Sequence, residues 1–282
     1  MLEVDMHVHS HYSDGSDSPR EIIRKAKLRG LKAVCLTDHD NVDGLAEFEN
    51  SLAEYKFDGL AGLEISSIYE GHIVHILGYG LDYSDSKKIQ TLLQANQQAL
   101  NHKIEKALES YKQAQIADIN LVEMNKLVGC KSTLGFILWL RDYRVRFCGA
   151  TPTQAKQETL RGGIAHTSYD KKKLMTPARA VRTVKELGGF AVWAHPGQFM
   201  NRVSETQLRN HIEELLATGI KGLEIFHPTN TKVQQEFLTT LARYYKLILT
   251  GGSDYHGRHK MNQLGEAGID YQSFLQIKKN LR

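Results

Sequence analysis

Residues 2–9 read LEVDMHVH, an apolar-rich run that predicts a β-strand ending in two histidines. His7 and His9 are two positions apart, and because successive side chains of a strand point to opposite faces, we expect both imidazoles on one face. Asp14 follows in the short loop Ser13-Asp14-Gly15 and offers a carboxylate oxygen. Taken alone, this pattern fits either a metal site or a polar strand end followed by a turn.

The same arrangement recurs along the chain, where other apolar runs lead into histidine or acidic residues. These are residues 31–37 (LKAVCLT) before Asp38-His39-Asp40, residues 190–194 (FAVWA) before His195, and residues 247–253 (LILTGGS) before Asp254-Tyr255-His256. Strand ends in a βα fold present their side chains to a common site. Imidazole and carboxylate groups are ligands that zinc, manganese and iron accept. The repetition predicts a multinuclear metal centre.

Two more candidates lie inside predicted strands. Glu64 stands within the run 60–66, where an unpaired buried carboxylate is costly, so it needs a metal ion or, more ordinarily, a Lys or Arg partner. His72 and His75 are three apart around the next strand, so only one of them faces the site. We choose His75, which lies inside the apolar run 73–79.

The complete candidate set consists of imidazoles and carboxylates: His7, His9, Asp14, His39, Glu64, His75, His195, Asp254 and His256. With Glu64 as a bridge, this set suits three divalent ions (Mn, Fe or Zn) at about three or four protein ligands each. A metal-bound imidazole usually gives its other N–H to a carboxylate or carbonyl. Asp38 or Asp40 is the expected partner of His39.

The flanking segments alternate between predicted strands and helices, which favours an α/β fold, either a parallel barrel or a doubly wound sheet. Ser18 as N-cap, Pro19 as the first helical residue and Glu21 closing a capping box mark one helix start, and Gly30 marks its end. Further helix starts are expected at Thr176-Pro177 and at Ser204, which has Gln207 at its capping-box position.

The alternation stops in the middle of the chain. Residues 84–111 form one long amphipathic pattern, and further helical stretches run to about residue 160. We therefore expect two parts: a catalytic barrel of residues 1–83 and 174–282, and a helical insertion of residues 84–173 that acts as a lid or substrate domain.

Composition and charge limit the class of protein. The chain has 282 residues, 41% of them hydrophobic, which is ordinary for a globular protein. No apolar run reaches the length of a membrane span and no secretory signal is visible. Cys35, Cys130 and Cys148 form no CxxC pair, so we expect reduced thiols and a cytoplasmic location.

The charge is unevenly distributed. Residues 81–175 hold 15 Lys/Arg and 9 Asp/Glu, so of the net charge of +4 this segment carries +6 and the remainder −2. A basic segment beside a metal-rich remainder would suit an anionic substrate, but a solvated helical surface explains it equally well.

Six motifs, in this order, resemble those of the PHP (polymerase and histidinol phosphatase) superfamily: HVHSHYSDG, LTDHD, GLEIS, VHILGYG, AHPG and GSDYHG. They are most similar to the bacterial metal-dependent phosphoesterases that act on nucleotides or short RNA, a branch that also has a helical insertion. The resemblance covers residues 1–80 and 176–282 well and the insertion loosely.

The resemblance implies a distorted (β/α)₇ TIM-like barrel with a trinuclear site. By motif, one ion would be held by His7, His9, Glu64 and Asp254, a second by Asp14, His39 and His256, and a third by Glu64, His75 and His195. Two positions depart from the branch: Gln198 stands where Arg is frequent, and Asn230 replaces the second His of a His-Pro-x-His segment. Both departures concern the substrate more than the metals.

These observations predict hydrolysis of a phosphate ester by metal-activated water. The expected partner is a phosphorylated small molecule, a nucleotide or a short RNA, with no membrane and no obligate protein partner. His227 is the candidate catalytic residue and phosphate contact, with Gln198 and Arg202 as further substrate contacts; His227 could equally be a structural loop residue. Arg141, Arg144 and Arg146 could hold a second phosphate, but an exposed helix face is the simpler interpretation.

Three alternatives remain at this stage. They are a phosphatase of the histidinol-phosphate type, a metal-dependent amidohydrolase, and a non-catalytic metal-stabilised module. The extra ligands Asp14, His39 and His256 disfavour the amidohydrolase, which would not need them. The complete ligand set gives no sign of a decayed site.

Overall fold

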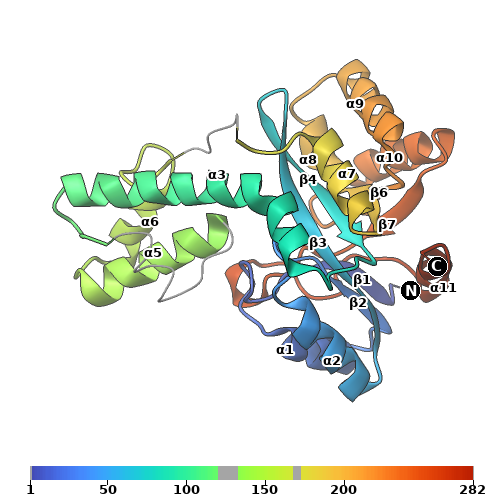
Figure 1. The fold of residues 1–282 in the computed structure, drawn as a ribbon, viewed down its shortest axis with the longest axis horizontal. Helices are drawn as coiled ribbons and strands as arrows, with labels where there is room; N and C mark the ends of the chain where they lie inside the picture. Colours follow the sequence, from blue (N-terminus) through green and yellow to red (C-terminus); the bar gives the residue numbers. More distant parts are fainter. Residues whose placement is uncertain (1, 120–132, 168–172, 282) are drawn as a thin grey trace. The chain divides into compact units, whose positions relative to one another are not determined.

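Seven strands form a single sheet in which the spatial order follows the chain order, β1 to β7. The computed structural model describes residues 2–119, 133–167 and 173–281 (Figure 1). The strands are β1 (Val4–Val8), β2 (Ala33–Leu36), β3 (Asp58–Tyr69), β4 (His72–Tyr79), β5 (Phe190–Trp193), β6 (Gly222–Phe226) and β7 (Ile248–Gly251). Each lies within or overlaps an apolar run that predicts a strand, which for β6 is residues 221–226 (KGLEIF).

One strand runs against the others. β4 is antiparallel to both β3 and β5, whereas the remaining neighbours are parallel. The turn between β3 and β4 consists of Glu70 and Gly71, with φ of 45° and 81°, as in a hairpin turn of type I′. A two-residue turn leaves no room for the helix that a parallel crossover requires. This agrees with the two successive strands predicted at residues 60–66 and 73–79, but not with a fully parallel barrel.

The sheet nearly closes into a barrel. Tyr255, just after β7, forms a bridge with Val8 of β1, and the His9 main-chain N–H donates to the Tyr255 carbonyl at 2.9 Å. This agrees with the predicted distorted seven-stranded barrel. Closure also carries the segment after β7 directly to the end of β1.

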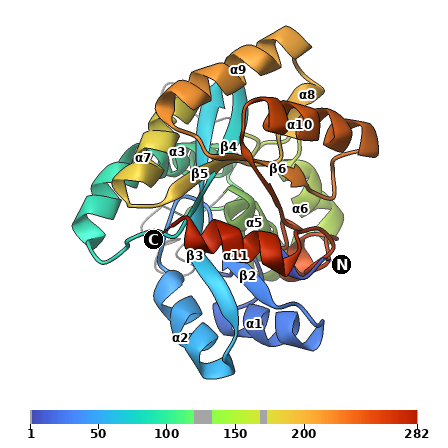
Figure 2. The ribbon, with the colours of Figure 1, turned by 90° about the vertical axis from the view of Figure 1, so that its right-hand side faces the viewer.

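Most helices that accompany the seven strands lie on the outside of the sheet (Figures 1 and 2). They are α1 (Pro19–Leu28), α2 (Leu45–Tyr55), α7 (Pro177–Glu186), α8 (Pro196–Met200), α9 (Glu205–Thr218), α10 (Lys232–Tyr244), the short 3₁₀ helix η1 (Gly257–His259) and α11 (Tyr271–Lys279). The predicted caps Thr176 and Ser204 are confirmed, the latter with a complete capping box.

The capping box predicted at the start of α1 forms only by half. Ser18 accepts from the Glu21 main-chain N–H at 3.1 Å, but the Glu21 carboxylate is engaged by Arg24 at 3.0 Å. The Arg24 guanidinium, one helical turn further along, binds the Glu21 carboxylate, which is therefore not bonded to the Ser18 main-chain N–H. Gly30 has the left-handed φ of 79° expected of a residue just past a helix end.

The barrel interior is apolar away from the strand ends that carry the histidines. Met6, Cys35, Leu77 and Val192 line it from four strands, and Phe274 of α11 packs into the same cluster. Figure 2 shows α11 lying across one end of the strands. Burying each such side chain contributes about 1.5–3 kcal/mol to folding, so this apolar cluster stabilises the arrangement of the strands.

The chain divides into two compact units, residues 1–92 with 175–282, and residues 93–174. Three described helices belong wholly or partly to the second unit: α3 (Ser86–Gln113), which begins in the first, α5 (Thr133–Phe147) and α6 (Pro152–Thr159). Ile104, Leu108, Phe136 and Leu140 form its core. Within it, Arg144 donates to both carboxylate oxygens of Glu158 at 2.8 Å, which gives this arginine a structural role.

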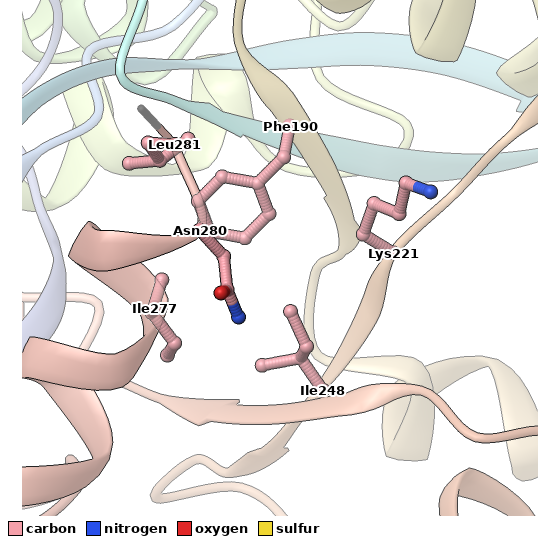
Figure 3. A pocket seen from close by; sticks show the side chains of 6 residues that line it. All are labelled: Phe190, Lys221, Ile248, Ile277, Asn280 and Leu281. Carbon is pink, nitrogen blue, oxygen red and sulfur yellow. The ribbon is translucent and has the colours of Figure 1, made fainter.

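A pocket of about 270 Å³ opens at the barrel end opposite the histidines (Figure 3). It is lined by Phe190, Lys221, Ile248, Ile277, Asn280 and Leu281. Phe190 and Ile248 are the first residues of their strands, whereas the histidine-bearing clusters follow strand ends. Among the described residues, no helix has the length and apolarity needed to cross a bilayer.

Candidate metal centre

A single buried carboxylate, that of Glu64 on β3, stands at the centre of the histidine clusters. Five imidazole nitrogens lie 3.1–3.3 Å from its two oxygens: those of His7, His9 and His39 at Oε2, and those of His75 and His195 at Oε1. These side chains come from the ends of β1, β2 and β5 and from β4. His75 reaches the cluster from within its strand because β4 runs backwards, so its first half lies at the site end.

Two further carboxylates join the remaining candidates to this centre. Asp14 Oδ1 lies 3.1 Å from His256 Nε2, and its Oδ2 lies 3.6 Å from His39 Nε2. Asp254 Oδ1 lies 3.3 Å from His9 Nε2. The structure therefore brings all nine predicted ligands together.

The electrostatics of the cluster favour ionised carboxylates. Glu64 is only 1% exposed, and burial opposes its ionisation, but His75, His39 and His7 hold its pKa well below its usual value. Burial likewise disfavours a charge on His9, yet the carboxylates of Asp254 and Glu64 raise its pKa to about 9. The cluster thus attracts positive charge, either protons or metal ions.

The donor atoms fit divalent metal ions. His7 Nε2 and His9 Nε2 lie 3.0 Å apart. Within the described part of the chain, His9 Nδ1, His39 Nδ1 and His256 Nε2 are buried and make no well-aligned hydrogen bond, although a carboxylate oxygen lies 3.1–3.6 Å from each. Nitrogen lone pairs converging on three carboxylates are a ligand set that Mn, Fe and Zn accept.

Three groups of donor atoms are close enough to share an ion: His9, Asp14, His39 and His256; His7, His9 and Asp254; and His39, Glu64 and His75. These overlap with the grouping that the resemblance implied but differ in detail. His9 joins the group of Asp14, and His39 takes the place of His195 beside Glu64 and His75. His195 remains adjacent, with its Nε2 at 3.3 Å from His75 Nδ1.

The loops that carry the ligands are held by two buried aspartates. Asp38 accepts from the Ser10 main-chain N–H at 2.8 Å and from Ser13 Oγ at 2.5 Å, which fixes the loop leading to Asp14. The sequence predicts Asp38 or Asp40 as the partner of His39, whereas in the structure the two ring nitrogens of His39 lie 3.2 Å from Glu64 and 3.6 Å from Asp14. Asp5 accepts in the same way from the Ser253 N–H at 2.9 Å, beside Asp254.

The backbone is constrained at the ligands themselves. His195 and Asp254 adopt left-handed conformations, with φ of 32° and 54°. Such conformations are uncommon for residues other than glycine and persist where surrounding contacts enforce them. They aim both side chains into the cluster.

Sequence reasoning missed Glu224, which is fully buried on β6. Its Oε1 lies 2.9 Å from His7 Nδ1, and its Oε2 accepts from the His195 main-chain N–H at 2.7 Å. A signal was present, because Gly222-Leu-Glu-Ile repeats the Gly62-Leu-Glu-Ile that contains Glu64.

The candidate substrate residues divide between the cluster edge and the surface. His227 Nε2 lies 3.8 Å from Asp254 Oδ2, and Gln198 reaches Thr229, which in turn contacts His227 Nδ1 at 2.8 Å. Arg202 is exposed in the turn after α8. Lys260, which the sequence did not single out, pairs with Asp254 Oδ2 at 2.8 Å.

A protein-family model and individual relatives of known name point to the same family for this chain. The PHP domain model matches residues 5–146. The phosphoribosyl 1,2-cyclic phosphate 1,2-diphosphodiesterase of Eggerthella lenta is 30% identical over 92% of this chain and 95% of its own length. The 5'-3' exoribonuclease of Haemophilus influenzae is 29% identical over 90% of each chain.

A solved structure, described as a metal-dependent phosphoesterase from Bifidobacterium adolescentis, matches with a TM-score of 0.78 and 28% identity. The match covers 97% of this chain and 94% of the other. The resemblance found in the six motifs is thereby confirmed, and the chain belongs to the PHP domain family.

Proposed function

We propose that this protein is a metal-dependent phosphoesterase that hydrolyses phosphate esters of a nucleotide or short oligonucleotide. The observation that carries the proposal is the convergence of five imidazoles on the buried Glu64 carboxylate, with Asp14 and Asp254 beside it. Relatives named as a cyclic phosphate diesterase and as an exoribonuclease support this substrate class.

The nine ligands would hold three divalent ions (Mn, Fe or Zn). With Glu64 shared between two ions, each ion would have three or four protein ligands. Such ions lower the pKa of bound water and neutralise charge on the phosphoryl oxygens. The protein holds their ligands in place through buried carboxylates and the constrained turns at His195 and Asp254. A side-chain nucleophile is then unnecessary.

His227 is proposed as the proton donor or phosphate contact. The Thr229 main-chain N–H donates to His227 Nδ1 at 3.2 Å, so in the neutral ring the proton sits on Nε2. Among the described residues, this buried Nε2 has no hydrogen-bond partner. It can therefore donate to a phosphate oxygen or a leaving oxygen beside Asp254.

The substrate's negative charge would be met by Lys260, whose ammonium lies at the edge of the cluster with 35% of its side chain exposed. Gln198 would contact the substrate from α8, where its side-chain amide donates to Thr229 Oγ1 at 3.5 Å. Arg202 is the outermost candidate, suited to a more distant phosphate. These roles can be ranked by the rise in KM on single replacement.

The domain roles are part of the same proposal. Residues 1–83 and 174–282 would form the catalytic barrel, and residues 84–173 a lid or substrate domain. We also propose a cytoplasmic location, which the free thiols of Cys35 and Cys148 support; Cys130 lies outside the described residues.

A matched pair of variants on one strand tests the proposed function. His75→Ala removes a nitrogen 3.1 Å from Glu64, whereas His72→Ala, three residues earlier, removes a ring that packs near Phe199. The assay uses Mn²⁺-supplemented protein with a nucleoside monophosphate, a cyclic phosphate and a short 5'-phosphorylated RNA, each with and without EDTA. We expect activity on at least one of them, lost with EDTA or His75→Ala and retained with His72→Ala. Hydrolysis that survives EDTA and His75→Ala would refute the proposal.

A further inference from the structure

Glu224 is a buried acid outside the three donor groups found among the described residues, yet it touches two of the candidate ligands. It lies on β6 with no exposed surface, flanked by the buried Leu223 and Ile225. Its two oxygens face different strands: Oε1 meets His7 Nδ1 from β1, and Oε2 meets the main chain of His195 after β5. One carboxylate therefore connects three strands just beneath the cluster.

We infer that Glu224 is a positioning residue that fixes the tautomer of His7 and the main chain of His195. The inference rests on the metal-dependent function proposed above. Because an ionised carboxylate only accepts hydrogen bonds, His7 Nδ1 must carry a proton, and in the neutral ring the lone pair is on Nε2. That Nε2 lies 3.3 Å from Glu64 and 3.6 Å from Asp254, within the cluster.

The second contact restrains a backbone that is otherwise unfavourable. His195 has φ of 32°, and its N–H donates to Glu224 Oε2 at 2.7 Å. Hydrogen bonds to ionised acceptors are about twice as strong as neutral ones, so this bond helps to hold the left-handed turn. The turn directs His195 Nε2 to within 3.1 Å of Glu64 Oε1.

Glutamine cannot replace this carboxylate, although it has nearly the same shape. Both oxygens of Glu224 accept from N–H groups, whereas an amide has one acceptor oxygen and an NH₂ that only donates. In Glu224→Gln, the NH₂ must therefore face either His7 Nδ1–H or the His195 N–H. His7 can escape by shifting its proton to Nε2, which removes the lone pair from the cluster.

The test compares Zn²⁺ binding by chelator-treated wild type, Glu224→Gln and the control Asp58→Asn, measured by calorimetry. Asp58 is a partly buried acid at the first residue of β3, where it accepts a hydrogen bond from the Tyr271 hydroxyl at 3.0 Å. Its replacement therefore perturbs the barrel at the end of β3 that lies away from the histidine cluster. We expect roughly 10–100-fold weaker Zn²⁺ binding for Glu224→Gln, and wild-type affinity for Asp58→Asn. A folded Glu224→Gln that binds Zn²⁺ as wild type does would overturn the inference.

A spectroscopic measurement keeps the inference decidable if Glu224→Gln does not fold. In ¹⁵N-labelled, Zn²⁺-loaded wild type, two-bond ¹H–¹⁵N spectra report which ring nitrogen of each histidine carries a proton. We expect a protonated Nδ1 for His7, and a protonated Nε2 would overturn the inference. Neither readout needs turnover, so a protein inactive on all phosphate esters would refute the proposed function while leaving this test intact.

Discussion

Two strands of the barrel carry the same four residues, Gly-Leu-Glu-Ile, at positions 62–65 and 222–225. Both glutamates are buried, and the leucine and isoleucine beside each are completely buried. Glu64 is nevertheless surrounded by five imidazoles, whereas Glu224 meets one imidazole and one main-chain N–H.

The difference comes from the neighbouring strands. β3 lies between β2 and β4, which supply His39 and His75, so its acid stands where side chains converge. β6 lies between β5 and β7, and its acid meets the main chain of His195 instead of the ring. An identical tetrapeptide thus yields a shared ligand in one strand and a supporting residue in the other.

The largest expected effect is that of Glu64→Gln. The change removes the negative charge that balances the surrounding imidazoles and replaces one of the two carboxylate oxygens with an NH₂ that cannot bind a cation. We therefore expect metal affinity to fall by more than the roughly 10–100-fold typical of a supporting residue. Metal content after gel filtration, measured by mass spectrometry, checks this directly. If Glu64→Gln kept more metal than Glu224→Gln, the assigned order of the two acids would be reversed.

The leucines that precede the two acids should contribute equally to stability, although the acids differ in role. Leu63 and Leu223 are both fully buried, so Leu63→Ala and Leu223→Ala should each lower the free energy of unfolding by about 2–5 kcal/mol. Urea denaturation of the chelator-treated proteins measures both. A much smaller loss at one position would mean that the repeats differ in packing as well as in chemistry.

A smaller effect on stability is expected at His211, a buried histidine that contacts neither Glu64 nor Glu224. Tyr69, Trp193 and Phe199 surround its ring, the carboxylate of Glu214 is 3.9 Å away, and burial lowers its pKa to about 3. In the unfolded chain the pKa is about 6.5. Stability from the neutral ring is therefore complete above about pH 6.5 and falls as the pH drops towards 3, by up to about 1.4 kcal/mol per pH unit.

His211→Phe should remove this dependence. Thermal unfolding between pH 4 and 7 should show a shallower decline for the variant than for wild type. Equal slopes would indicate that the buried ring accepts a proton in the folded protein and would contradict the assigned pKa.

The seven strands and all nine cluster residues could be predicted from the sequence, because apolar runs that end in or contain histidines and acids are local patterns, as is the acid in the loop after His9. The reversal of β4 could not be predicted, since it depends on Glu70 adopting a left-handed conformation that its residue type does not favour. The half-formed capping box at Ser18 depends similarly on which group Glu21 meets first.

Glu224 and Lys260 show the other limit of the sequence. Glu224 has the same local pattern as Glu64, but its role is set by residues 29 and 217 positions away, His195 and His7. Lys260 follows no periodic pattern and meets Asp254 only through the course of the loop after β7. The role of Glu224 arises from contacts between distant segments and that of Lys260 from the path of one loop, and the sequence alone reveals neither.

We propose that the cluster around Glu64 binds divalent metal ions, with the Glu64 carboxylate shared between them. Anomalous diffraction from crystals grown with Mn²⁺, recorded on both sides of the manganese edge, tests it most directly. We expect anomalous peaks among the nine ligands, two of them in contact with the Glu64 carboxylate. An absence of peaks at Glu64, with its oxygens bonded only to protonated histidines, would contradict it.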